Sequence, residues 1–384
     1  MVGAIPWESD IFADRENNSD ALFRTLGVQG SATAIRFNTN GDEGKAALRA
    51  EQAGIIQAAH QIFRGMPLEI IKRQENIANL IFIHVPITDH DEQLDNMLRN
   101  VQGVTDVFLS ISLEFEAPPP STEYTKDERI LETLKEASDI ADSYLGVSQV
   151  RDEQCLTGQA IRVAVLDSGV DYTHALFGGS GNVHDFEQAT KSTSPRADGL
   201  FPTQRVVAGH DFIPTTTSTS DDTNPIDKKG GHGTMVASCI TAVAPQAEII
   251  ALKVCSNSGS CPDYAVIEAL DFAFEHGAKV ANLSLGQPYI DGYYYVLTRI
   301  LEDMTKLGMV IVVASGNYGN HQFILSGLAD APNAITVGAT SSATGRMAFF
   351  SSRGPGILNG LKPDISAPGS TMSKFCDYLA ASVP

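Results

Sequence analysis

The sequence predicts an α/β protein whose main domain is a doubly wound, mostly parallel sheet, preceded by a smaller α+β domain. The chain of 384 residues is longer than one hydrophobic core usually supports. A proline-rich stretch at 117–121 separates two patterned regions, because three prolines forbid helix and favour an extended linker. In the second region, short apolar strands alternate with helices. Such alternation is typical of a parallel sheet with helices on both faces.

The first region follows the order strand, helix, strand, strand, helix, strand. After an irregular segment at 1–31, we expect strands at 33–37, 69–72, 80–85 and 106–113, and helices at 44–64 and 91–101. This order predicts a split βαβ domain of the ferredoxin-like kind over 32–116, joined by a linker at 117–125 to the second region.

The second region, 126–373, opens with a predicted helix at 126–144. We expect strands at 161–166, 206–212, 248–254, 279–285, 309–313 and 334–338. We expect helices at about 232–243, 263–276 and 293–307. In doubly wound sheets the ligand site forms at the carboxyl ends of the strands. The unusual polar residues of this sequence lie at those ends.

Composition excludes some classes of partner. The formal net charge is −19, and no cluster of Lys and Arg is present to bind phosphates, so no nucleic-acid partner is expected. No run of about 18 apolar residues predicts a membrane span. The first residues lack the basic and apolar pattern of a secretory signal, which leaves the compartment open.

Five cysteines do not form a disulfide framework or a zinc motif. Cys255 and Cys261 bracket a five-residue loop that a disulfide could close, and two separate thiols remain the alternative.

Two polar residues stand where an acid–base pair could form. Asp167 follows the apolar strand 161–166, although an aspartate at a loop start is usually a turn or cap residue. His232 lies in Gly-Gly-His-Gly-Thr on the first turn of an apolar helix, where glycines expose the ring and let other groups approach. The glycines favour a functional histidine, for which Asp167 is the candidate partner.

Two further strands end in groups suited to a developing negative charge. Asn317 closes Val312-Val-Ala-Ser-Gly-Asn, and its amide could donate to an oxyanion. Asn282-Leu-Ser-Leu-Gly286 ends another strand. Gly-Asn is also a common turn pair, and for each motif taken singly a plain turn is the stronger interpretation. Only their combination points to catalysis.

In chain order, the motifs around Asp167, His232, Ser284 and Asn317 resemble those of the subtilisin-like serine proteases, the peptidase S8 family. The resemblance continues through 334–339, 349–355 and 362–369, and covers about 145–369. It implies that Asp167 orients His232, the general base and then acid, and that Asn317 donates to the oxyanion. Peptide substrate in an extended conformation would pair with the backbone of Ser284, Leu285 and Gly286.

The same resemblance extends to partners and cofactors. The first domain is similar to the inhibitor I9-type propeptide, which implies that the chain's own propeptide lies in the cleft until it is cut off. No cofactor is expected. Many members bind calcium, but no calcium site is identifiable in this sequence, and 239–244 is too short for the loop that many carry there. Members are mostly secreted or vacuolar.

The sequence departs from the family at the nucleophile. The family's serine lies in a Gly-Thr-Ser-Met motif roughly twenty residues after the Ala-Pro-Gly that here ends at Gly369, and that motif is absent. Ser373 comes too early, Ser382 has no such context, and 374–384 is an atypical tail. We therefore expect a serine endopeptidase by family that is truncated before its serine and inactive as written.

Two functions stay open. The first is the truncated endopeptidase, and the second is a pseudoprotease that binds peptides or a protease partner without cutting. A nucleotide-binding α/β domain is excluded, because no strand is followed by a GxGxxG or Walker loop.

Overall fold

The computed structural model describes 42–63, 69–74, 80–84, 92–101, 104, 107, 112–114 and 145–369. Within the last range, short gaps fall at 196–198, 214–221, 229–230, 288–294, 320, 342–343 and 358–359. The chain divides into two compact units, Met1–Ser110 and Ile111–Pro384. The strand predicted at 33–37, the helix predicted at 126–144 and the tail at 374–384 lie outside the described residues.

The first unit contains helices α3 (Asp42–Ile62) and α4 (Glu92–Arg99) and an antiparallel pair of strands, β1 (Glu69–Gln74) and β2 (Leu80–His84). These elements confirm the two predicted helices and the two predicted central strands, with shifted ends. Ala59 of α3 and Leu98 of α4 are buried together with Phe63, which directly follows α3. Burial of this apolar surface holds the helices together.

Of the strand predicted at 106–113, the structure describes Val107 and the last two residues, while 106 and 108–111 lie outside the described residues. Val107 is described outside any strand, and strand β3 (Ser112–Glu114) belongs to the second unit. Its partner is β7 (Ser260–Pro262), 148 residues further along the chain. A three-residue strand carries too little pattern for the sequence to predict such a long-range pairing.

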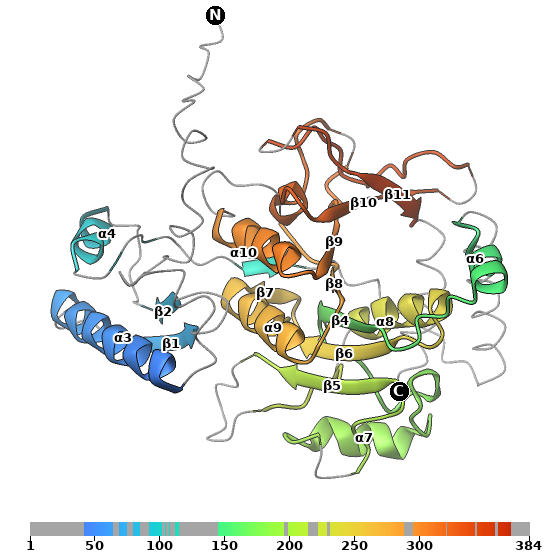
Figure 1. Cartoon of the computed structure of the whole chain (residues 1–384), viewed down its shortest axis with the longest axis horizontal. Helices are drawn as coiled ribbons and strands as arrows, with labels where there is room; N and C mark the ends of the chain where they lie inside the picture. The colour runs from blue at the N-terminus through green and yellow to red at the C-terminus, as the bar shows by residue number, and fades with distance from the viewer. Residues whose placement is uncertain are drawn as a thin grey trace, which may run out of the picture. The chain divides into compact units, whose positions relative to one another are not determined.

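The second unit is built on a seven-stranded parallel sheet with the order β11-β10-β9-β8-β4-β6-β5 (Figure 1). The strands are β4 (Arg162–Asp167), β5 (Val206–Asp211), β6 (Glu248–Lys253), β8 (Val280–Leu283), β9 (Val310–Ala314), β10 (Ile335–Thr340) and β11 (Ile365–Pro368). Helices flank the sheet, as Figure 1 shows. The predicted doubly wound α/β fold is confirmed.

The described helices of this unit are α6 (Val147–Gln154), α7 (Val183–Lys191), α8 (His232–Val243), α9 (Asp263–Glu275) and α10 (Tyr295–Lys306). Single 3-10 turns lie at η2 (Ala175–Phe177) and η3 (Gly327–Asp330). The bounds of α8 agree with the prediction. Strand β11 and helix α7 were not predicted, because β11 is four residues long and α7 buries only Phe186 and Ala189. No helix among the described residues is long and apolar enough to cross a membrane.

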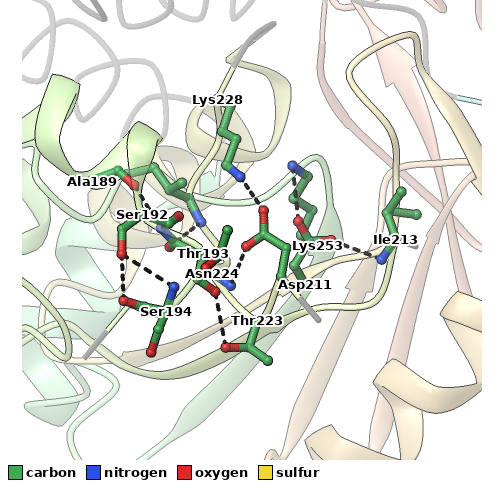
Figure 2. A network of polar contacts seen from close by, with 12 residues as sticks. Ala189, Ser192, Thr193, Ser194, Asp211, Ile213, Thr223, Asn224, Lys228 and Lys253 are labelled. Carbon is green, nitrogen blue, oxygen red and sulfur yellow. Dashed lines mark hydrogen bonds and ion pairs between the residues drawn. The ribbon is translucent and has the colours of Figure 1, made fainter. Parts of the chain in front are cut away.

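The parallel register places three charged residues in one row at the carboxyl edge of the sheet. Asp167 of β4 is the partner of Lys253 of β6, which is in turn the partner of Asp211 of β5. Lys253 Nζ lies 3.3 Å from Asp211 Oδ2, and both side chains are buried. Figure 2 shows this ion pair with Lys228 nearby, and Lys228 forms a second ion pair, with Asp222.

A disulfide joins Cys255 to Cys261, which decides between the two alternatives that the sequence left open. Among the described cysteines, Cys155 and Cys239 form no disulfide; the first is exposed and the second half-buried.

Candidate active site

The buried carboxylate of Asp167 is hydrogen-bonded to the ring of His232. Strand β4 ends at Asp167, and α8 begins at His232 directly after Gly231, which has a φ of 66°. His232 Nδ1 lies 2.7 Å from Asp167 Oδ1, which also accepts the Ser168 N–H at 2.7 Å. An ionised carboxylate only accepts hydrogen bonds, so Nδ1 carries the proton and Nε2 is the basic nitrogen of the neutral ring.

Helix α8 approaches β4 closely enough to require a glycine next to the histidine. A Cβ at Gly233 would lie 2.1 Å from the carbonyl oxygen of Gly169 and 3.0 Å from Asp167 Cβ. The close approach is supported by a hydrogen bond, because the Gly233 N–H donates to Ser168 Oγ at 3.0 Å. Gly-Thr after the histidine therefore permits the 2.7 Å contact with Asp167.

The environment of His232 favours the imidazolium. Burial lowers the pKa of the ring, but the charge of Asp167 and its hydrogen bond, followed by Asp227 and Cys239, outweigh burial and raise the pKa above 6.5. The folded protein therefore binds this proton more tightly than the unfolded chain. The resulting stabilisation is fully present below pH 6.5 and is lost as pH rises through the raised pKa.

Asp227 is a second buried acid near this pair, which the sequence interpretation missed. Its Oδ2 accepts the Thr234 hydroxyl at 2.8 Å and the Thr234 N–H at 3.3 Å, so it anchors the first turn of α8. Burial raises its pKa from 3.8 to about 6, and the neighbouring charge of Asp167 adds to the rise. An aspartate five residues before a histidine gives no signal that it folds back beneath the helix.

Replacing Asp227 with asparagine is expected to stabilise the fold at high pH. The folded pKa is raised, so the contribution of the acid to stability is present below pH 3.8 and lost as pH rises through about 6. Asparagine avoids this loss and still accepts from Thr234. At about 1.4 kcal/mol per pKa unit, the gain above pH 7 is up to about 3 kcal/mol, falling to near zero at pH 4. Urea unfolding between pH 4 and 8 measures it, and a pH-independent difference would contradict the prediction.

Other predicted site residues meet His232 around one cavity. Its lining includes Ser284, Leu285 and Gly286 after β8, Asn317 after β9, and Glu114 of β3. Asp167 is fully buried and contacts the imidazole ring from behind. The structure thus brings the imidazole, a side-chain amide and the backbone segment 284–286 to one place at the carboxyl edge of the sheet, where the sequence expected these residues.

An extended segment of the chain lies along this cavity. The Glu114 N–H donates to Gly286 O at 3.1 Å, and the Gly286 N–H donates to Glu114 O at 2.9 Å. On its other side, β3 is antiparallel to β7, with Leu113 opposite Cys261. Residues 112–114 therefore lie between β7 and the segment at Gly286, with which Glu114 forms an isolated antiparallel bridge, and Leu113 is fully buried.

A second, larger cavity of about 370 Å³ adjoins the first. Both cavities are lined by Ser284, Ala314, Gly316 and Asn317. The remaining lining comes from one side of α8, including Val236 and Ile240, and from the ends of β8, β9, β10 and β11. This cavity is therefore a mainly apolar space next to Asn317.

No group of three or more His, Cys, Asp or Glu suited to a metal ion occurs among the residues that the structure describes.

Known proteins of one family match this chain. The profile of the subtilase family matches residues 158–382. Subtilisin Savinase of Lederbergia lenta is 33% identical over 246 residues, which cover 60% of this chain and 76% of that protein. Alkaline protease of Alkalihalobacillus alcalophilus is 32% identical over 246 residues, and Subtilisin E of Bacillus subtilis (strain 168) is 28% identical over 266.

The matched parts span 54% of the alkaline protease and 57% of Subtilisin E, so this chain corresponds to little more than half of each. The family match nevertheless covers more than half of the 384 residues and includes Asp167, His232 and Asn317. The chain belongs to the subtilase family.

Proposed function

We propose that this chain carries the acid–base and oxyanion-binding parts of a serine endopeptidase that hydrolyses peptide bonds through an Asp-His-Ser triad. The observation that supports it most is the 2.7 Å hydrogen bond between Asp167 and His232 beside a cavity that Asn317 also lines. In this role His232 Nε2 takes the proton of the serine and later gives it to the leaving amine. Asp167 keeps the proton on Nδ1 and stabilises the imidazolium. Asn317 donates to the tetrahedral oxyanion.

The substrate of this endopeptidase is a peptide in an extended conformation. Strand pairing with Ser284, Leu285 and Gly286 gives affinity through the main chain, whatever the side chains of the substrate. The two hydrogen bonds between Glu114 and Gly286 illustrate such a pairing. They also support the proposal that 32–116 is a propeptide whose end lies in the cleft in the manner of a substrate.

The nucleophile belongs next to His232 and Asn317, at the start of an apolar segment that fills the adjoining cavity of about 370 Å³. The 384 residues contain no Gly-Thr-Ser-Met motif to supply it. We propose that a polypeptide of this sequence alone is inactive as an endopeptidase. Without the nucleophile no covalent catalysis is possible, and only a residual acceleration of about 10³ to 10⁴-fold over water remains.

Labelling with a fluorophosphonate probe tests both parts of this proposal. We expect no labelled serine in the 384-residue polypeptide. Fusing a C-terminal segment that carries Gly-Thr-Ser-Met and an apolar helix is expected to produce labelling at the new serine. In the same fusion, His232→Ala is expected to abolish the labelling. A labelled serine in the original polypeptide, or labelling of the fusion that His232→Ala leaves unchanged, would contradict the assignment.

The alternative function is a pseudoprotease that binds peptides without cleaving them. The strand pairing of 112–114 favours it, because this contact needs no nucleophile. A fusion that binds peptides but never reacts with the probe would identify the chain as a binding module.

A further inference from the structure

The disulfide between Cys255 and Cys261 joins strand β7 to a residue that is hydrogen-bonded to the candidate catalytic aspartate, Asp167. Cys255 lies two residues after the end of β6, and its N–H donates to the carbonyl oxygen of Asp167 at 3.1 Å. The N–H of Val254 donates to the same oxygen at 2.8 Å. Cys261 is the central residue of β7. Both cysteines are fully buried.

Strand β7 forms one edge of the groove around 112–114. Glu114 directs its N–H and its C=O to Gly286. Successive residues of a strand direct these groups to opposite edges, so those of Leu113 face Cys261, its register partner. The amide of Leu113 therefore reports on contact with β7, and the amide of Glu114 reports on contact with Gly286.

The disulfide adds a second covalent link, beside the backbone of 256–259, between the end of β6 and β7. Among the described strands, β7 pairs with β3 and takes no part in the seven-stranded sheet. Its end continues directly into α9. Before it, the turn from Ser256 is closed by its own contacts, Ser256 N–H to Ser260 O at 2.8 Å and Gly259 N–H to Ser256 O at 3.0 Å.

We propose that the Cys255–Cys261 disulfide is a positioning element for peptide binding, which holds β7 where it can pair with an extended chain in the cleft. A peptide is then held on both edges, by Gly286 on one side and by Cys261 on the other. This inference rests on the proposed peptide-binding cleft. The bridge closes a short loop with a sequence separation of 6. Because a short loop restricts the unfolded chain little, the effect of the bridge is concentrated on β7.

Residue-resolved amide hydrogen exchange of the whole chain tests the proposal. In the double variant Cys255→Ala/Cys261→Ala, we expect exchange of the Leu113 amide at least about tenfold faster than in the original chain. Exchange of Val165, in the centre of β4, is expected to change less than about twofold, and the Nδ1 proton resonance of His232 is expected to persist. The matched control is Cys155→Ala, which removes an exposed free thiol and is expected to leave Leu113 unchanged.

The outcomes separate this inference from the proposed function. If the amides of Leu113 and Glu114 exchange freely in the original chain, the groove does not hold this segment. That result would contradict the proposed peptide-binding role of the cleft itself. If both are protected and the double variant leaves Leu113 unchanged, only the role of the disulfide is overturned. Loss of protection in β4 as large as that at Leu113 would assign the bridge to global stability and would also overturn the proposal.

Discussion

Replacing Asp167 with asparagine is expected to lower the pKa of His232 and to remove most of the activity of any form of the protein that carries the serine. The negative charge and hydrogen bond of Asp167 together oppose the effect of burial on the pKa of His232. An asparagine can present its NH₂ to Nδ1, which moves the ring proton to Nε2, the nitrogen that must accept the proton of the serine. In serine proteases of this type, such a tautomer change lowers kcat by about 10⁴-fold.

Two measurements separate the tautomer from a general loss of structure. Titration of the His232 ring by NMR in the 384-residue chain is expected to show a lower pKa in Asp167→Asn. In the serine-bearing fusion, kcat is expected to fall while KM changes little, because the groove at Ser284–Gly286 is untouched. The matched control is Asp227→Asn, which leaves the hydrogen bond to Nδ1 in place and is expected to retain most of kcat. An unchanged His232 pKa in Asp167→Asn would exclude the proposed pairing.

The sequence could predict the central parallel sheet and the helix that carries His232, because both depend on local patterns. Strand β4 is a continuous apolar run, as expected for a strand buried on both faces, and α8 begins at a histidine between glycines. Asp167, His232 and Asn317 were predicted from motifs at the ends of such elements. The structure then supplied the contact between the first two and the cavity that His232 and Asn317 share.

What the sequence could not predict depends on contacts between distant residues. The pairing of β3 with β7 and the anchoring of Thr234 by Asp227 have no local signature, since each residue type involved is common in loops. The disulfide stayed undecided, because spacing alone does not fix the geometry of two cysteines. The ion pair between Lys253 and Asp211 was also missed, because charged residues at strand ends are usually exposed.

This ion pair shows how the carboxyl edge of the sheet accommodates several acids. Lys253 is 4% exposed and Asp211 is 6% exposed. Burial raises the pKa of Asp211 to about 6, although the charge of Lys253 opposes the rise. Lys253 opposes the rise in the pKa of Asp227 in the same way. One buried cation therefore stabilises the ionised forms of two acids, and Asp227 in turn acts on His232.

Replacing Lys253 with methionine is expected to destabilise the fold by about 3–5 kcal/mol at pH 8, because it leaves the buried charge of Asp211 without its cation. Without Lys253, the pKa of Asp211 is expected to rise further above 6. The stability that protonated Asp211 contributes at low pH is then lost as pH rises through this higher pKa. The cost is therefore expected to be smaller at pH 5, where Asp211 is protonated. Urea unfolding at the two pH values measures the difference.

Two further variants distinguish the buried charge from loss of the lysine side chain. Lys228→Met breaks the neighbouring ion pair with Asp222, in which the lysine side chain is 22% exposed and the aspartate side chain 4% exposed. Water reaches this lysine more than Lys253, so its loss is expected to cost more than the about 1 kcal/mol of an exposed pair and less than Lys253→Met. Adding Asp211→Asn to Lys253→Met removes the unpaired charge and keeps an acceptor for the Ile213 N–H, which lies 2.9 Å from Asp211 Oδ1. The double variant should then recover most of the stability at pH 8. Equal losses in the single and double variants would show that Lys253 acts through packing, and the buried acids near His232 would then not depend on its charge.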